Sequence, residues 1–220
     1  MRKYFLILAA VAAVLNTGAE AMHVHSQVYL YKPLATLLLA VVVLRAADQS
    51  RADQSRYHRW MGAGLVAALA GDILLMLPQG LFLPGLTAFL VAHLCFIRAF
   101  ATDGGGLRAP LLPAVPVAVA AIGMLVYLWP SLGSMRWPVV CYAVAIAAMA
   151  WQAIARWSVR RTSHAAWAAV GSVFFLASDS MLASDRFVAP FATAAYVVLG
   201  TYYAALWGLT LSVRDVNATA

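Results

Sequence analysis

The sequence is poor in charged residues. Only 10% of its 220 residues are Asp, Glu, Lys or Arg, and 64% are hydrophobic, whereas a soluble globular chain carries charge at roughly a quarter of its positions. This shortage excludes a soluble enzyme, because most of the surface must face lipid. Strict alternation of apolar and polar residues is also lacking, so helices are favoured over membrane strands. We therefore expect an all-α polytopic membrane helix bundle, in which each backbone forms its hydrogen bonds within its own helix.

Cysteine is scarce as well. Cys95 and Cys141 are the two cysteines of the chain, and both fall inside apolar runs without CxxC spacing. They indicate neither a metal knuckle nor a disulfide framework. The net charge of +7 would suggest a nucleic-acid partner in a soluble protein. Here the basic residues indicate a topology instead, and we expect no nucleic-acid partner.

Long apolar runs are abundant. Runs of about twenty apolar residues are the template for a spanning helix, and the chain of 23.5 kDa has room for one domain, residues 1–220. Eight such spans are predicted, near residues 3–19, 28–45, 60–77, 82–100, 110–129, 137–156, 164–184 and 191–213.

Basic residues gather on one side of this predicted topology. The opposite side has Arg136 and Arg186, and Lys32 lies within a span. By the positive-inside rule both termini are then cytoplasmic, and we expect a multi-pass protein of the bacterial inner membrane. The other twelve basic residues flank the spans on the side of the termini: Arg2, Lys3, Arg45, Arg51, Arg56, Arg59, Arg98, Arg108, Arg156, Arg160, Arg161 and Arg214.

The first predicted span has an alternative interpretation. Arg2 and Lys3, the apolar stretch and the small residues around Glu20 also fit a cleaved signal peptide. Cleavage would leave seven helices in the same orientation. We favour a retained helix, because the apolar run is long enough to span the bilayer with some tilt.

Four ionisable side chains fall inside the outer half of predicted spans, where each is a candidate functional residue because charge is costly in lipid. Lys32 lies near the outer end of the second span. Asp72 and Asp179 each lie six residues before the outer end of their spans, which corresponds to a depth of about 9 Å. His93 lies about 14 Å deep. These similar depths predict one shared polar cavity.

A structural role is the alternative for each of these residues. Lys32 could reach the interface and pair with one aspartate, and His93 could satisfy a buried hydroxyl. Two aspartates favour chemistry or transport, because one would suffice to pair Lys32. A zinc site is disfavoured, because His93 is the intramembrane histidine and three or four ligands are needed. A serine hydrolase is disfavoured because the GxSxG elbow is lacking.

Two neighbouring carboxylates in a low dielectric suit acid and base chemistry. They do not both ionise easily, so one can donate a proton while the other stays charged. Glycosidases divide the work on acetals in this way. The sequence does not decide which aspartate is the acid.

Several short motifs follow one another along the spans. They are Lys32-Pro33, Gly71-Asp72, the stretch FLPGLTAFLVAH that ends at His93, Ser178-Asp179 and Tyr202-Tyr203. In this order they resemble the YhhN family, the membrane lysoplasmalogenases. The resemblance implies an eight-helix protein that hydrolyses the vinyl ether bond of lysoplasmalogens to a fatty aldehyde and a glycerophospho-base.

The resemblance also implies roles for these residues. Asp72 and Asp179 would be the catalytic pair, and no metal or organic cofactor would be needed. Phe96 and Leu206 depart from the family pattern, which bears on substrate preference. The residues expected to bind the substrate or to set the protonation of the aspartates are Lys32, His93, Ser178, Tyr202 and Tyr203.

Vinyl ether chemistry agrees with this site. Protonation of the β-carbon gives an oxocarbenium ion, water adds, and the hemiacetal collapses, which suits one acid and one carboxylate. A lysophospholipid and the surrounding membrane lipid are then the expected partners. A proton-coupled transporter, a non-catalytic scaffold and a hydrolase of another lipid stay open as alternatives, although an inverted repeat typical of transporters is not evident. The sequence leaves the oligomeric state open.

Overall fold

The computed structural model describes residues 1–22, 24–50, 52–102 and 110–213, and it is built from helices throughout these ranges. Within these ranges eight helices are long and apolar enough to cross a membrane, as the sequence predicted. Two short 3₁₀ turns, η2 (Trp129–Ser131) and η3 (Gly133–Met135), join α5 to α6. The helices are α1 (Arg2–Ala21), α2 (His25–Asp48), α3 (Ala52–Met76), α4 (Phe82–Phe100), α5 (Ala114–Leu128), α6 (Arg136–Arg160), α7 (Ser163–Phe187) and α8 (Ala194–Leu211).

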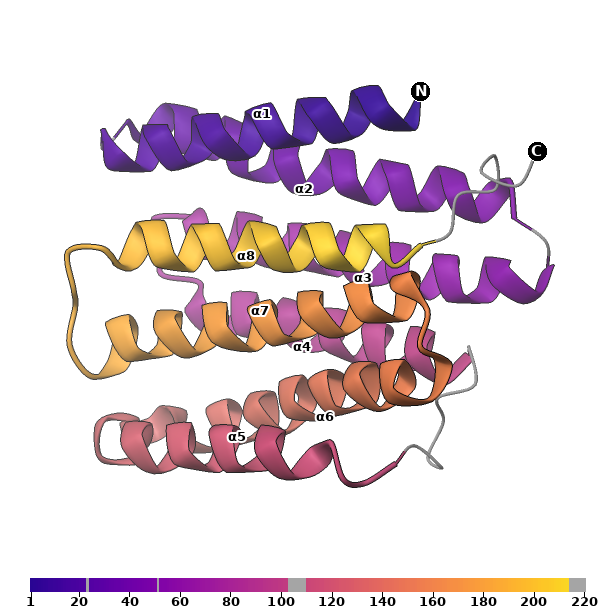
Figure 1. Ribbon diagram of the computed structural model, residues 1–220. Helices are drawn as coiled ribbons and strands as arrows, with labels where there is room; N and C mark the ends of the chain where they lie inside the picture. The colour runs from indigo at the N-terminus through magenta and orange to yellow at the C-terminus, as the bar shows by residue number, and fades with distance from the viewer. Residues whose placement is uncertain (23, 51, 103–109, 214–220) are drawn as a thin grey trace.

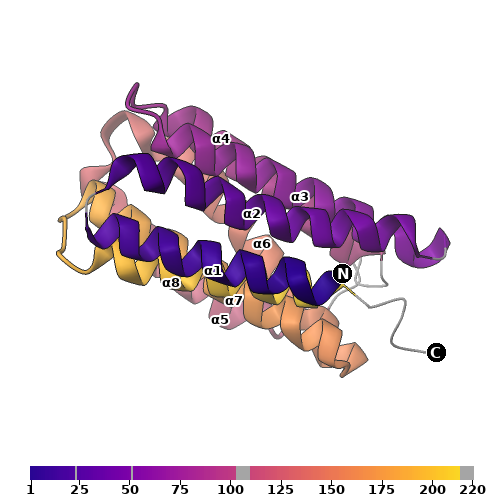
Figure 2. The same cartoon turned by 90° about the horizontal axis from the view of Figure 1, so that it is seen from above.

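The helices run alternately up and down, with both described chain ends at the same end of the bundle (Figure 1). Helices α1 and α2 lie at one edge and α5 and α6 at the other. Between these edges α7 and α8 lie in front of α3 and α4 (Figure 1). Figure 2 shows α1 lying over α8 in the view from above. The predicted site residues come from α2, α3, α4, α7 and α8, which are neighbours in this arrangement.

The connection between α2 and α3 is shorter than predicted. Helix α2 continues to Asp48 and α3 already begins at Ala52, although the predicted spans ended near residue 45 and began again near residue 60. Good helix formers such as Ala, Gln and Arg fill this stretch, and it has no Gly or Pro to stop a helix. At the corner the hydroxyl of Ser50 lies 2.7 Å from Nδ1 of His58.

Basic side chains are divided between the two ends of the bundle as predicted, within the described ranges. Arg45, Arg98 and Arg160 occupy the last turns of α2, α4 and α6 at the end that holds the termini. Arg136 begins α6 at the opposite end. Arg51, Arg108 and Arg214 lie outside the described residues. We call the two ends the terminal end and the far end.

Helices α7 and α8 approach each other backbone to backbone. A Cβ atom added to Gly208 would lie 2.7 Å from the Cα of Gly171, closer than any real Cβ contact. Small residues allow such approaches between membrane helices. This contact sets the spacing between α7, which carries Asp179, and α8, which carries Tyr202.

Candidate active site

Asp72 lies at the centre of the bundle, where side chains from α2 and α8 converge on it. Its carboxylate is fully buried. Oδ2 accepts hydrogen bonds from the Thr36 hydroxyl at 2.7 Å and from the Tyr202 hydroxyl at 2.6 Å. The ammonium of Lys32 lies 3.5 Å from Oδ1. We call Asp72, Lys32, Thr36 and Tyr202 the central cluster, and it joins three helices through one carboxylate.

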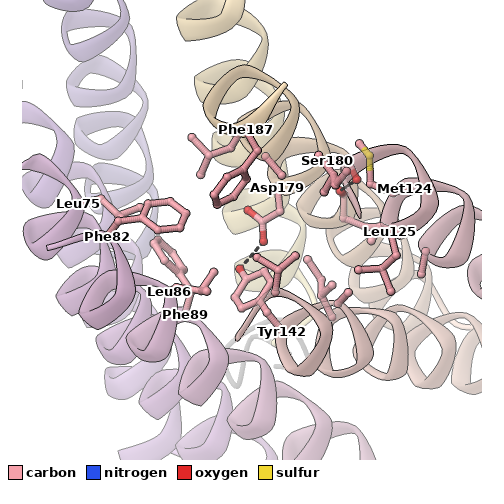
Figure 3. A pocket seen from close by; sticks show the side chains of 18 residues that line it. Leu75, Phe82, Leu86, Phe89, Met124, Leu125, Tyr142, Asp179, Ser180 and Phe187 are labelled. Atoms are coloured by element: carbon pink, nitrogen blue, oxygen red, sulfur yellow. Dashed lines mark hydrogen bonds between the residues drawn. The ribbon is translucent and has the colours of Figure 1, made fainter. Parts of the chain in front are cut away.

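Asp179 has different surroundings. The Tyr142 hydroxyl on α6 donates a short hydrogen bond to its Oδ2 (Figure 3). The carboxyl group points into a cavity between Phe89 of α4 and Leu125 of α5 (Figure 3). We call this cavity the apolar slot. It has about 80 Å³ of space open to water-sized molecules. Its lining is apolar apart from Asp179, Tyr142 and Ser180.

An aromatic wall stands between the central cluster and the Asp179–Tyr142 pair. The His93 ring lies 5.1 Å from the Tyr142 ring and 4.8 Å from the Phe175 ring, between centroids. The Phe175 and Phe89 rings in turn lie 5.7 and 6.0 Å from the Tyr202 ring. The wall, Phe89, His93 and Phe175, therefore separates the two aspartates.

Gly71 makes room for this wall. A Cβ atom at Gly71 would lie 2.6 Å from the ring of Phe89. The glycine beside Asp72 thus lets the Phe89 ring pack against α3, where it both lines the apolar slot and contacts the Tyr202 ring. The Gly71-Asp72 motif combines a packing residue with a carboxylate.

A second cavity opens near the far end of the bundle. It has about 350 Å³ of space open to water-sized molecules. Its lining includes the ionisable residues Glu20, His25, Lys32 and Asp185. We call it the charged vestibule. Leu75 and Leu182 line both this vestibule and the apolar slot. Asp179 lines the slot and Lys32 lines the vestibule, whereas Asp72 and His93 line neither of these described cavities. The sequence had predicted one polar cavity shared by all four.

The remaining predicted residues have mainly packing contacts. The Ser178 hydroxyl donates to the backbone carbonyl of Val198 at 3.0 Å and ties α7 to α8. The Tyr203 ring is buried with its centroid 5.6 Å from that of Tyr202. Neither ring nitrogen of His93 has a hydrogen-bond partner among the described residues. Phe96 and Leu206, the departures from the family pattern, are fully buried in the core.

Sequence reasoning missed two members of the site, Thr36 and Tyr142. Thr36 lies four residues after Lys32, so both side chains project from the same face of α2. Tyr142 lies six residues after Arg136, the start of α6, and is therefore about 9 Å deep. That depth equals the one predicted for both aspartates. Applying the depth argument to hydroxyl groups as well as to charges would have found Tyr142.

The described residues offer little to a metal ion. No group of three or more His, Cys, Asp or Glu side chains comes together in the ranges that the structure covers. Cys95 and Cys141 are free cysteines on α4 and α6. The described site offers carboxyl, hydroxyl and ammonium groups.

Comparison with known proteins gives consistent matches. The model of the YhhN family matches residues 27–213. A lysoplasmalogenase of Mycobacterium tuberculosis is 35% identical over 84% of this chain and 69% of its own length. Lysoplasmalogenase TMEM86B of Sus scrofa is 33% identical over 81% of this chain and 72% of its own. The Escherichia coli membrane protein YhhN is 30% identical over 81% of this chain and 83% of its own. No solved structure matches the chain.

Proposed function

The chain belongs to the YhhN family, and on that premise we propose that it hydrolyses the vinyl ether bond of lysoplasmalogens to a fatty aldehyde and a glycerophospho-base. Relatives named lysoplasmalogenase cover most of the chain at 33 to 35% identity. The observation that carries the proposal is the single carboxyl group of Asp179 on the wall of an apolar slot. An alkenyl chain is apolar, and its one reactive double bond needs a proton.

Asp179 is the proton donor of the proposed reaction. A carboxyl group in apolar surroundings is the kind that enzymes use as a general acid. Because Oδ2 accepts the hydrogen bond from Tyr142, the acidic proton is assigned to Oδ1. This proton is transferred to the β-carbon of the vinyl ether, and the electron pair of the double bond forms the new C–H bond. The positive charge is then shared by the α-carbon and the ether oxygen.

Water completes the reaction. A water molecule adds to the α-carbon and gives one proton back to the Asp179 carboxylate, which leaves a hemiacetal. Collapse of the hemiacetal moves a proton to the ether oxygen, breaks the carbon–oxygen bond and releases the aldehyde. One water is consumed, and the acid is regenerated without any oxidant or reductant.

Asp72 is the second carboxylate of the proposed pair, and it acts through its neighbours. It does not line the apolar slot, but it holds the Lys32 ammonium and the Tyr202 hydroxyl in place. Lys32 also lines the charged vestibule, where a cation can attract a lipid phosphate. The central cluster therefore positions a cation beside the slot that contains the acid.

The proposed setting is the bacterial inner membrane with both termini in the cytoplasm. Basic residues at the terminal end of the described bundle support this orientation. The charged vestibule then opens toward the opposite leaflet. Helix α1 packs against α2 and α8 at the edge of the bundle and contributes Glu20 to the vestibule, which supports its retention in the mature chain. The whole chain forms one domain in this proposal.

The test is aldehyde release from an alkenyl lysophospholipid by the purified protein in detergent. In D₂O the mechanism predicts one deuterium on the carbon next to the aldehyde group, provided that the product is reduced to the alcohol immediately. In water labelled with oxygen-18 it predicts label in the aldehyde oxygen, again after immediate reduction.

Two variants test the residue roles. Asp179→Asn is expected to abolish release, whereas Asp48→Asn, which removes an exposed carboxylate at the terminal end of α2, is expected to retain it. A folded wild-type protein that releases no aldehyde would refute the proposed reaction. Release that is unchanged in Asp179→Asn would refute the assignment of the acid.

A further inference from the structure

The charged vestibule and the apolar slot lie side by side and share two lining residues, Leu75 and Leu182. One space is charged and the other is apolar. We propose that the charged vestibule is a subsite for the zwitterionic head group of the lysolipid, with Lys32 and His25 facing the phosphate and Glu20 and Asp185 facing the ammonium. This inference rests on the proposed function. It assigns a binding site to the head group, the part of the substrate that the reaction leaves unchanged.

The charges of the vestibule match the two charges of the head group. Lys32 carries an ammonium with three donor hydrogens, so it can hold Asp72 and a phosphate oxygen together. His25 adds an imidazole that can donate a hydrogen bond. Glu20 and Asp185 add carboxylates, and Asp185 already accepts a hydrogen bond from the backbone N–H of Phe191 at 3.1 Å. A zwitterion therefore meets complementary charge, whereas a bare phosphate meets two carboxylates that repel it.

The elements around the vestibule hold these charges apart. Glu20 comes from the end of α1, His25 and Lys32 from α2, and Asp185 from the end of α7. Lys32 lies seven residues inside α2, whereas the other three lie at or near the ends of their helices, and it is tied to Asp72. The phosphate is therefore assigned to the inner part of the vestibule and the base to its mouth, which is the order in which they occur in a lysolipid entering with its chain in the slot.

Helix α7 provides a measure of length. Asp179 lines only the slot, Leu182 lines both spaces and Asp185 lines only the vestibule. The six-residue step from Asp179 to Asp185 corresponds to about 9 Å along the helix. A chain of single bonds advances about 3.5 Å for every three bonds, so the roughly nine bonds from the ether oxygen to the ammonium nitrogen reach about 10 Å. One molecule can therefore place its vinyl ether at Asp179 and its ammonium at Asp185.

The test compares two substrates that differ in the base alone. The first is an alkenyl lysophosphoethanolamine, and the second is the same alkenyl lysophosphate without ethanolamine. We expect the wild-type protein to have the higher kcat/KM for the first. Glu20→Gln and Asp185→Asn are each expected to reduce this preference about ten-fold, the effect of losing one charge-assisted hydrogen bond. Asp48→Asn removes a carboxylate far from the vestibule and should leave the preference unchanged.

A reversed charge makes the test stronger. Glu20→Lys replaces repulsion of a bare phosphate by attraction, so kcat/KM for the alkenyl lysophosphate should rise while that for the ethanolamine lipid falls. A merely structural role of Glu20 would reduce both values together. That result, or a preference that neither Glu20→Gln nor Asp185→Asn alters, would overturn the subsite.

A binding measurement separates this inference from the proposed reaction. The probe is a 1-alkyl lysophosphoethanolamine, which has the same head group but a saturated ether that acid does not cleave in this way. Its competition with the substrate, or its stabilisation of the protein against heat, should weaken in Glu20→Gln and not in Asp48→Asn. If the wild type cleaves neither substrate but this difference in binding persists, the reaction is wrong and the subsite is supported. Equal binding to wild type and Glu20→Gln would overturn the subsite.

The same probe separates a lysolipid from ordinary membrane lipid. Diacyl phosphatidylethanolamine has the same head group but two chains. The vestibule adjoins one apolar slot, which would hold one chain and leave the second without a place. The subsite predicts that the single-chain probe competes at least ten-fold more strongly. Equal competition by the diacyl lipid would overturn its assignment to the lysolipid.

Discussion

The two intramembrane aspartates have contrasting environments. Asp72 is fully buried, and its carboxylate contacts the Thr36 and Tyr202 hydroxyls and the Lys32 ammonium. Asp179 faces a cavity and has one described hydrogen-bond donor, Tyr142. A carboxylate with three partners is held in one position, whereas a carboxyl group on a cavity wall can meet a substrate. The two aspartates therefore lie at similar predicted depths but are suited to different roles.

This contrast predicts different consequences when each charge is removed. Removing one partner of a buried ion pair leaves the other charge uncompensated and destabilises the fold. Removing a carboxyl group from a cavity wall leaves no such charge behind. Stability and activity should therefore respond separately at the two aspartates.

The largest expected effect is the loss of activity in Asp179→Asn. The amide still accepts the hydrogen bond from Tyr142 but has no acidic proton, so kcat should fall about 1,000-fold, within the range for a general acid. Unfolding in detergent by heat or SDS should occur close to the wild-type midpoint. Activity within ten-fold of the wild type would show that another group protonates the substrate, and the contrast would then fail.

Asp72→Asn is expected to affect stability first. The Lys32 ammonium loses its counter-charge while its side chain is only 18% exposed, so the free energy of unfolding should fall by about 3 kcal/mol. The measurement is unfolding in mixed micelles. Activity should fall as well, because Lys32 and Tyr202 lose their fixed positions.

A double variant sharpens this prediction. Lys32→Met combined with Asp72→Asn removes both charges, so it should be more stable than Asp72→Asn alone by about 1 kcal/mol or more, a coupling typical of residues in contact. Activity should not recover, because the cation of the vestibule is gone. Additive destabilisation would mean that the ion pair contributes nothing and that Asp72 is held by Thr36 and Tyr202 alone.

The contact between α7 and α8 sets the spacing between the two aspartate environments. The substitution Gly208→Ala tests this contact. An alanine Cβ would lie 2.7 Å from the Cα of Gly171, so Gly208→Ala should force the helices apart at a cost of about 2 kcal/mol. Gly200→Ala is the matched control on α8, because nothing lies within 4 Å of its added Cβ. We expect reduced activity and stability in Gly208→Ala and neither in Gly200→Ala. Equal behaviour of the two variants would show that this contact does not fix the site.

The sequence predicted the architecture better than the site. Long apolar runs gave eight helices in order, because lipid requires them. The helical extension of α2 and α3 between residues 45 and 60 was missed. The charged residues there ended the apolar runs, although Ala, Gln and Arg favour helix. Depth along each helix was predictable from the end of the helix, but depth does not specify the face of the helix. Asp72 and Asp179 were therefore expected in one cavity, and their separation by Phe89 and Phe175 was not foreseen.

A smaller effect is expected at Tyr142, a residue that charge alone could not reveal. Burying a hydroxyl group costs far less than burying a charge, so Tyr142 was not among the charged candidates, and the structure shows its contact with Asp179. Tyr142→Phe keeps the ring that contacts His93 and removes only the hydrogen bond. We expect kcat to fall about ten-fold, the effect of about 1.4 kcal/mol, because the carboxyl group is no longer fixed with Oδ1 toward the slot.

The matching change in the central cluster is Tyr202→Phe, which removes one of the two hydroxyl donors to Asp72. It should reduce stability by about 1 kcal/mol and reduce kcat less than Tyr142→Phe does. The measurements are aldehyde release and unfolding on the same two preparations. If Tyr202→Phe is the variant with the greater loss of kcat at unchanged stability, Asp72 rather than Asp179 is the group nearest the reaction, because a hydroxyl that only supports packing would change stability and leave the chemistry alone.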